Sequence, residues 1–374
     1  MKSDISRYIS CTRYNSAPNA ILVKQYTDNF HAIVTSLRTI NITPSLFAVY
    51  SKNRESELIE LDEQIVVIHD QYLGQTINML NRLFFNTEGA IEYSMYFYKI
   101  YAEYLQLSGS LNMALYCANK YAVMETSCRS HRLDKKIEYR HFNTAVHEFF
   151  IIWHEVAHFL MMVTPKIKRK FFSVDGINRV RNRTYRYIDA IFDDDETVSR
   201  LKKSIDNIGL VEECLCDDIA IYYALQHFRG RDYKLKMSFS TYSGYSEFSF
   251  KEEDILKAFY LFFCNITLLD KIRLFTVALV SPTLTDSVMK DKFSIPSIRL
   301  INAENAIRSL DKLADEDFAI ISERILKSEY AIIDIFAELN EQNRGHTIYS
   351  SRDYRELNRV IDSLTNWGPS NTYV

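Results

Sequence analysis

The residues best suited to chemistry are two histidines and a glutamate in segment 147–158, HEFFIIWHEVAH. His154, Glu155 and His158 have the H-E-x-x-H spacing, which suits hydrolysis at a zinc ion. Positions four apart share one side of an α-helix, so both histidines can turn an imidazole toward the same metal. Glu155 points about 100° away and can reach a water on that metal without being a ligand. The spacing predicts a metal-activated water with Glu155 as general base.

A catalytic zinc site needs a third protein ligand and an open fourth position. Segment 212–220, EECLCDDIA, supplies candidate carboxylates on a second predicted helix. Glu213 and Asp217 are four apart, so Glu213 could bind the metal while Asp217 accepts the second N–H of a ligand histidine. Glu212 and Asp218 form a rival pair shifted by one residue, and spacing alone does not choose between the two pairs.

His147 lies on the same helical stripe as the two motif histidines. It precedes His154 by seven residues, which advance about 10.5 Å along a helix. We therefore expect His147 to cap the helix or to support the site rather than bind the ion. Thr144 is the expected N-cap of this helix, which should run to about Val163 before Thr164-Pro165.

These two segments together resemble the gluzincin class of zinc peptidases. Members such as the ImmA/IrrE-like proteins and the phage-exclusion peptidases combine H-E-x-x-H with E-x-x-A-D-x-x-A on a later helix. Here Glu213, Asp217 and Ala220 match, and Cys216 stands at the usual first alanine. The resemblance covers residues 147–226. It implies a zincin-like helical core, one Zn²⁺ ion, and Glu213 rather than Glu212 as third ligand.

A later segment, 294–300 (SIPSIRL), is similar to an H-P-x…R segment of some of these peptidases, with Ile295 in place of the histidine. Arg299 is a candidate clamp for a substrate carboxylate. Tyr242 and Tyr245 are candidate hydrogen-bond donors to an oxyanion. The resemblance also implies an edge strand that holds the substrate backbone, and either strand of a hairpin at 56–70 could serve.

The stretch between the two motifs is strongly charged. Segment 166–186 holds eight basic residues against one acid, Asp175, and the acidic run 193–196 follows. We expect a solvated loop that acts as a lid or a substrate-selecting surface. Tyr185 and Tyr187 alone make no stacking platform, so we do not expect nucleic acid to bind this segment.

Composition limits the class of protein, its partners and its location. The chain has 374 residues, 47% hydrophobic and 25% charged, as in globular proteins, and its net charge of -3 argues against attraction to nucleic acid or anionic membranes. The polar N-terminus lacks a signal-peptide core, and the apolar run 258–269 is too short to span a bilayer. We expect a cytoplasmic protein with reduced thiols at Cys11, Cys117, Cys128, Cys214, Cys216 and Cys264.

Few glycines and prolines predict long helices, and the fold class is mainly α (α+β) with a small sheet. We expect a core over 1–250 and a helical region over 251–374, packed as one unit. Beyond the motif helices, expected helices cover 23–39, 75–85, 90–107, 111–126, 251–279, 297–314, 317–341 and 353–364, and segment 233–250 is expected to be extended.

The sequence as a whole favours a zinc-dependent endopeptidase that cleaves a specific intracellular protein. Two alternatives remain open at this stage. One is a zinc-containing regulator that binds a protein or nucleic acid without hydrolysis, and the other is a hydrolase of non-peptide amides or esters. Glu155 favours hydrolysis, because a zinc site used only for binding needs no acid at that position.

Overall fold

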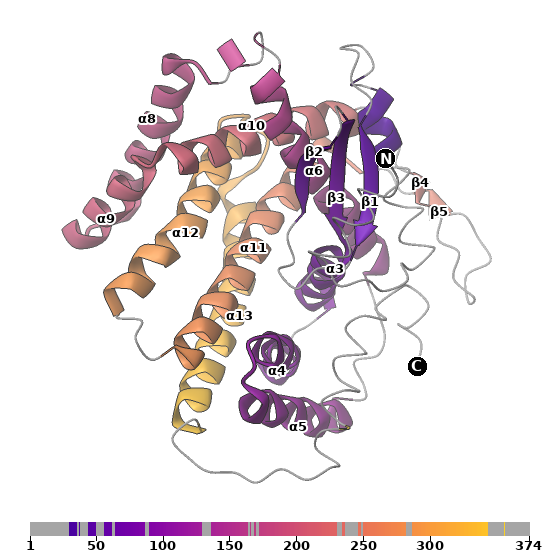
Figure 1. Ribbon diagram of the computed structural model, residues 1–374, viewed down its shortest axis with the longest axis vertical. Coiled ribbons are helices and arrows are strands. Elements are labelled where there is room, and N and C mark those ends of the chain that lie inside the picture. Colours follow the sequence, from indigo (N-terminus) through magenta and orange to yellow (C-terminus); the bar gives the residue numbers. More distant parts are fainter. Residues whose placement is uncertain are drawn as a thin grey trace.

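The computed structural model is mostly helical with a small three-stranded sheet, which confirms the predicted fold class (Figure 1). Among the described residues, no helix is long and apolar enough to cross a membrane. The structure describes residues 30–35, 37, 44–49, 56–61, 64–86, 90–128, 136–163, 165, 168–169, 172–229, 234–235, 246–247, 250–281, 286–342 and 355.

The helices are long, as the scarcity of glycine and proline predicts. Residues 30–35 and 37 are also helical, within the expected first helix, and residues 353–364 lie outside the described residues except for 355. The helices are α3 (Gln71–Asn86), α4 (Ala90–Leu107), α5 (Leu111–Ser127), α6 (Ile137–Val163), α8 (Val174–Ile191), α9 (Asp195–Ile205), α10 (Ile208–Phe228), α11 (Glu252–Val280), α12 (Asp286–Arg308) and α13 (Asp315–Gln342).

The sheet contains the predicted hairpin and one strand that the sequence did not reveal. Its order is β1-β3-β2, with β3 (Gln64–Asp70) antiparallel to β2 (Glu57–Leu61) and parallel to β1 (Ser45–Val49). Val66, Val67 and Ile68 are fully buried, as a central strand with both faces covered requires. In the segment expected to be extended, β4 (Lys234–Leu235) pairs with β5 (Ser246–Glu247).

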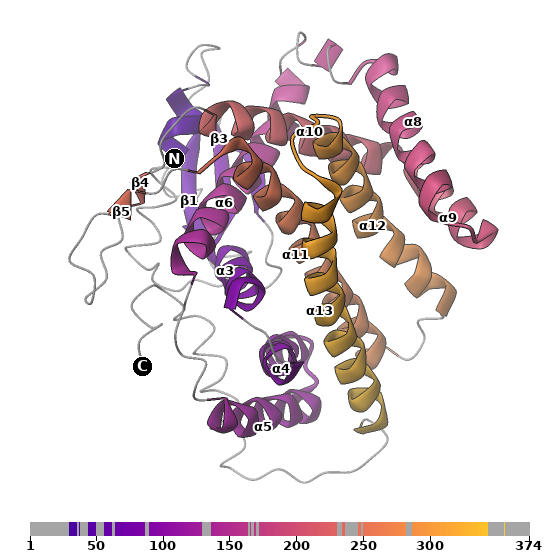
Figure 2. The ribbon, with the colours of Figure 1, turned by 180° about the vertical axis from the view of Figure 1, so that it is seen from behind.

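Helix α6 occupies the middle of the molecule, where it packs against α3, α10 and α11 and beside β2 and β3 (Figures 1 and 2). The main hydrophobic core surrounds it. This core contains residues from both sides of position 250, among them Phe150, Ile221, Phe259 and Ile332. The apolar run 258–269 lies in α11 and is largely buried, as expected for a core helix.

Helix α6 begins earlier than the sequence indicated, so the predicted capping roles of Thr144 and His147 are wrong. The helix starts at Ile137, and Thr144 Oγ1 bonds the Arg140 carbonyl oxygen inside it. A buried threonine is tolerated in mid-helix because its hydroxyl can bond the carbonyl four residues back.

His147 belongs to a buried polar chain that joins three helices. Its Nε2 lies 2.7 Å from the Ala258 carbonyl oxygen of α11, and its Nδ1 lies 3.3 Å from Asn81 Nδ2 of α3. Asn81 also donates to Thr144 Oγ1 and accepts from Asn265 Nδ2, each at 3.0 Å. Burial lowers the pKa of His147 to about 3, so the ring is neutral, with Nε2–H donating and Nδ1 accepting. The chain fixes the rotation of α6 relative to α3 and α11.

The expected loop over 166–186 is mostly helix, which corrects the sequence interpretation. Helix α8 buries every fourth residue: Gly176, Val180, Thr184 and Ile188. This buried stripe is narrow and lies between charged positions, so the sequence showed no clear apolar periodicity. Ser173 and Asp194 cap α8 and α9 by accepting backbone N–H groups of Gly176 and Thr197. The charged segment therefore packs as an ordered pair of helices.

Helix α12 also differs from its predicted bounds. It starts at Asp286 and continues through Pro296, whereas the sequence placed its start after this proline. A proline inside a helix removes one backbone hydrogen bond and normally ends it. Contacts of α12 with α8, α9, α10 and α11 hold the helix continuous across that position.

The polar chain gives a stability prediction. Asn81→Leu keeps the branched shape and the number of heavy atoms but removes the hydrogen bonds of Asn81 to His147 Nδ1, Thr144 Oγ1 and Asn265 Nδ2. We expect the free energy of unfolding to fall by roughly 2–4 kcal/mol, because each buried polar group left unsatisfied costs about 1–3 kcal/mol. Urea denaturation followed by circular dichroism measures this. The control Asn178→Leu, on the exposed side of α8, should change it by less than about 0.5 kcal/mol; equal losses would contradict the prediction.

Candidate metal centre

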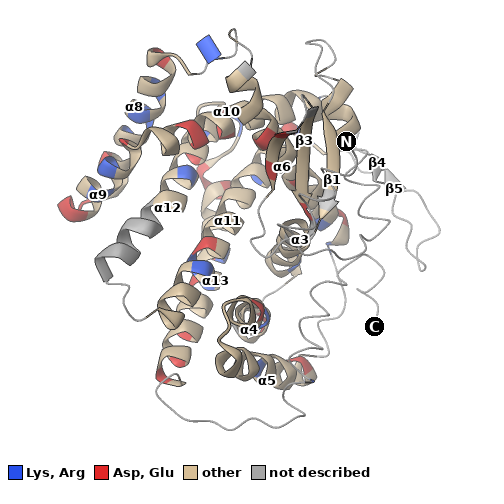
Figure 3. Cartoon of the chain, viewed as in Figure 1, with Lys and Arg blue, Asp and Glu red and all other residues tan. Residues whose placement is uncertain are grey.

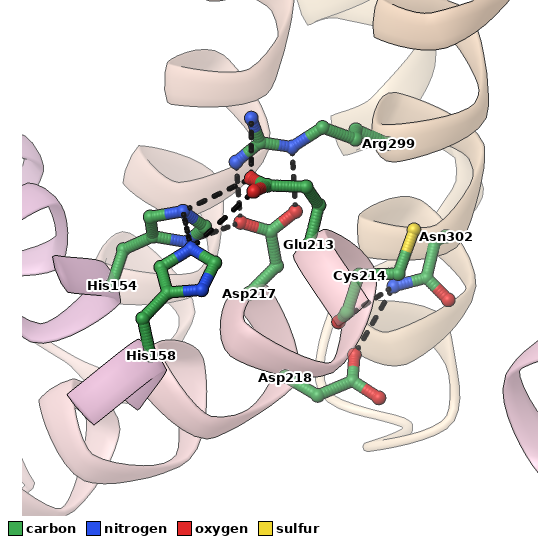
Figure 4. Close-up of polar contacts among 8 residues, drawn as sticks. All are labelled: His154, His158, Glu213, Cys214, Asp217, Asp218, Arg299 and Asn302. Carbon is green, nitrogen blue, oxygen red and sulfur yellow. Dashed lines mark hydrogen bonds and ion pairs between the residues drawn. The ribbon is translucent and has the colours of Figure 1, made fainter. Parts of the chain in front are cut away.

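The two motif histidines and Glu213 meet between α6 and α10 (Figure 4). His154 Nε2 lies 3.3 Å from His158 Nε2 and 3.2 Å from Glu213 Oε2. His158 Nε2 lies 3.4 Å from Glu213 Oε1. Among the described residues, these three form the one cluster of histidine, cysteine and acidic side chains suited to hold a metal ion.

The spacing of these atoms fits zinc. Bond lengths of about 2.0–2.1 Å and tetrahedral angles place zinc ligands about 3.3–3.4 Å apart. The 3.3 Å between the two histidine Nε2 atoms matches that spacing, and the two oxygens of Glu213 lie 3.2 Å from His154 Nε2 and 3.4 Å from His158 Nε2. Two imidazoles and one carboxylate are also a donor set that zinc accepts in catalytic sites, where a fourth position stays open. The residues present therefore fit a zinc ion.

Asp217 fixes the orientation of His154. Its carboxylate is fully buried, and its Oδ1 lies 2.9 Å from His154 Nδ1. A proton on Nδ1 facing this carboxylate leaves the Nε2 lone pair directed at Glu213 and His158, which is the tautomer a metal ligand needs. The structure thus places Asp217 where the sequence expected it, one helical turn after Glu213.

Arg299 comes from α12 and contacts both carboxylates of the site. Its Nε and Nη2 donate to the two oxygens of Asp217 at 2.9 and 2.7 Å, and Nη1 lies 3.4 Å from Glu213 Oε2. The fork geometry of the guanidinium suits such paired contacts. The sequence singled out Arg299 for a substrate carboxylate; its partners here are carboxylates of the protein. No spacing signal links residues 82 positions apart, so this pairing was not foreseen.

Opposite charges in the cluster stabilise one another's ionised forms. Burial alone would lower the pKa of His154, but Asp217 and Glu213 raise it to about 9. Burial opposes ionisation of Asp217 and of Glu213. Arg299 and His154 nevertheless hold the pKa of Asp217 low, and both histidines with Arg299 hold that of Glu213 well below its usual range. The carboxylates are therefore ionised, and His154 would have to give up a proton to hold a metal ion.

The structure also distinguishes between the two rival carboxylate pairs, Glu213 with Asp217 and Glu212 with Asp218. Asp218 faces away from the histidines and accepts Arg183 Nη2 at 2.8 and 2.9 Å and Asn302 Nδ2 at 3.2 Å. Glu212 is not part of the metal-binding cluster. The rotation of α10 against α6 thus turns Glu213 and Asp217 toward His154 and directs Asp218 to α8 and α12 (Figure 4).

Among the described residues, the other candidates His147, Cys214 and Cys216 are not part of the cluster. His147 bonds Ala258 and Asn81 in the core instead of the site. Cys214 and Cys216 are fully buried in the hydrophobic cluster around α10, as small core residues. Tyr242 and Tyr245 lie outside the described residues.

Glu155 faces the same cavity as the three candidate ligands. This cavity has a volume of about 470 Å³, and its lining includes His154, Glu155, His158, Glu213 and Arg299. Burial raises the pKa of Glu155, which the neighbouring histidines only partly offset. A carboxylate with a raised pKa is a stronger base than one in water, which suits proton transfer near neutral pH.

The basic stretch does not form a surface of one sign. Figure 3 shows acidic and basic residues interspersed along α8 and α9. Arg183 is engaged by Asp218, Arg181 donates to the Asp206 carbonyl oxygen, and Lys202 lies 2.5 Å from Asp189. Arg183 thus joins α8 to α10, whereas the contacts of Arg181 and Lys202 join α8 to α9 and its C-cap.

Comparison with protein-family models, with curated proteins and with solved structures yields no match for this chain. The resemblance to gluzincins therefore rests on the motif residues and their spacing.

The ligand assignment predicts opposite outcomes for two adjacent glutamates. Glu213→Gln should reduce bound zinc from one ion per chain to well below one, because a neutral amide is a poor zinc ligand. Glu212→Gln, on the neighbouring face of α10, should keep a full equivalent. Elemental analysis of dialysed protein measures both. Equal zinc contents in the two variants would refute the assignment of Glu213.

Arg299→Gln should weaken zinc binding by about 10- to 100-fold, the usual effect of removing an outer partner of the ligands. Its loss removes two of the three contacts described for the buried Asp217 carboxylate and leaves the one with His154. Competition with a chromophoric chelator gives the affinity. Arg308→Gln is the control on the same helix, since Arg308 contacts Glu304 and Asp315 away from the cluster. An unchanged affinity in Arg299→Gln would show that Asp217 holds His154 without help.

Proposed function

We propose that this chain is a zinc-dependent endopeptidase that acts on a specific protein in the cytoplasm. The observation that carries the proposal is the meeting of His154 Nε2, His158 Nε2 and the two oxygens of the Glu213 carboxylate at 3.2–3.4 Å, in a cavity that Glu155 also lines. A bound zinc ion would supply Lewis-acid chemistry, lowering the pKa of water and polarising the carbonyl group under attack.

The residues of the chain have distinct roles in the proposed reaction. His154, His158 and Glu213 would hold the ion, and Asp217 keeps the His154 ring in the required tautomer. Glu155 takes a proton from the attacking water and delivers it to the leaving amine. The raised pKa of Glu155 supports both steps, since the same carboxyl must first accept and then release a proton.

A peptide substrate is supported by the position of β2. Strand β3 is paired on both sides, so only an outer strand of this sheet can accept a further strand, and β2 is the outer strand that lies beside α6. Ser56, immediately before β2, lines the cavity together with the candidate ligands. A substrate strand paired with β2 would thus lead toward Glu155 through backbone hydrogen bonds.

The cytoplasmic location rests on the thiols. The described cysteines, Cys117, Cys128, Cys214, Cys216 and Cys264, are all free. Free thiols persist in reducing compartments, which supports an intracellular protein and an intracellular substrate.

Glu155→Gln should retain one zinc ion per chain and lose peptidase activity by about 10²–10⁴-fold, because the proton acceptor is removed while the ligands remain. Expression of this variant in the native cytoplasm, followed by mass spectrometry of retained proteins, identifies the substrate, and incubation with the wild-type chain then tests cleavage. A fully active Glu155→Gln variant would exclude Glu155 as the base. Tight partner binding with no cleavage by the wild type would favour the non-hydrolytic alternative.

A further inference from the structure

The cavity extends well beyond the candidate metal centre, along one face of α11. Its lining includes Phe262, Phe263, Ile266, Leu269, Asp270 and Arg273, which recur every three or four residues. From Phe262 to Arg273 the helix rises about 16 Å at 1.5 Å per residue. An extended peptide rises about 3.3 Å per residue, so this face matches a segment of about five residues.

The part of this face nearest the candidate ligands is aromatic. The rings of Phe150, Phe262 and Phe263 pack together, with centroids 4.7 Å apart for Phe150–Phe262 and 5.3 Å for Phe150–Phe263. The Phe150 ring also lies 6.1 Å from that of His154. An apolar wall therefore begins within one side-chain length of the site, and Ile266 continues it one turn further along α11.

The polarity changes at the other end of the face. Asp270 and Arg273 lie 3.7 Å apart and are each partly exposed. Between the site and this pair, the α11 lining is largely apolar: Phe263, Ile266 and Leu269, with Thr267. A charged or small polar side chain placed against the aromatic wall would lose its hydration without a partner, whereas a large apolar one would bury its surface.

We propose that the aromatic and aliphatic stretch of α11 is the pocket for one bulky apolar side chain of the peptide substrate, next to the bond that is cut. This inference rests on the proposed function and gives it a substrate class: extended segments with leucine, isoleucine, methionine or an aromatic residue beside the scissile bond. Ile266 is the specificity-determining residue, because it is half-buried at the cavity surface while the phenylalanines are locked in the core.

The test uses the full chain with its zinc content measured, and four peptide hydroxamates that bind zinc and differ only in the adjacent side chain: phenylalanine, leucine, alanine or aspartate. We expect the phenylalanine and leucine compounds to bind at least about tenfold more tightly than the alanine compound. The aspartate compound should bind most weakly. Equal affinities, a preference for aspartate, or no binding of any compound to the zinc-loaded chain would overturn the inference.

Two variants locate the preference on α11. Ile266→Glu should reduce the advantage of leucine over alanine to about twofold or less, since a carboxylate would then line the pocket. Val277→Glu makes a similar change on the exposed side of the same helix and should leave the advantage unchanged. Ile266→Ala, which needs no buried charge, should raise the ratio of phenylalanine to leucine affinity. An unaltered preference in both Ile266 variants would contradict the pocket assignment.

The same measurements distinguish this inference from the proposed function. Graded hydroxamate affinities without cleavage of any peptide would refute the peptidase and leave the apolar pocket standing. Cleavage with equal affinities for all four compounds would refute the pocket and leave the peptidase standing. A chain that binds no zinc would contradict the metal centre itself, which elemental analysis establishes before either assay.

Discussion

The buried carboxylate of Asp217 is the constraint on which the candidate site depends. A fully buried charge is very unfavourable unless it is paired and hydrogen-bonded. Asp217 meets that requirement with His154 on one side and the Arg299 guanidinium on the other. Because these partners lie on α6 and α12, while Asp217 lies on α10, satisfying one carboxylate aligns three helices. The same alignment directs Glu213 toward both histidines.

A second polar system acts on the same helix, closer to its N-terminus. The chain of His147, Asn81, Asn265 and Thr144 ties α6 to α3 and α11 in the core, two turns before His154. Helix α6 is thus held at two points along its length by groups that cannot be left unsatisfied. An apolar helix could rotate or slide between neighbours at modest cost, whereas these bonds specify one orientation and so fix where His154 and His158 point.

Helix α11 links the hydrophobic core to the proposed substrate pocket. Its buried residues form much of the main hydrophobic cluster, and the same aromatic side chains continue into the cavity wall. Such a wall is rigid because it is part of the core, and rigid walls discriminate between side chains by shape and burial. The proposed chemistry and the proposed specificity therefore arise from two faces of one packed unit: carboxylates and imidazoles from α6 and α10, and an apolar surface from α11.

The sequence by itself determined what depends on local periodicity. Residues four apart on one helix must share a face, so the H-E-x-x-H geometry, the pairing of Glu213 with Asp217, most helix bounds and the hairpin were predictable. Spacing left Glu212 and Glu213 equivalent, although the resemblance favoured Glu213. The tertiary structure decided which of the two glutamates faces the histidines, the contacts of Arg299, the place of His147 in the core and the helical packing of the basic stretch. Each depends on which faces of distant segments meet, and only the burial of apolar surface together with the pairing of buried charges settles that.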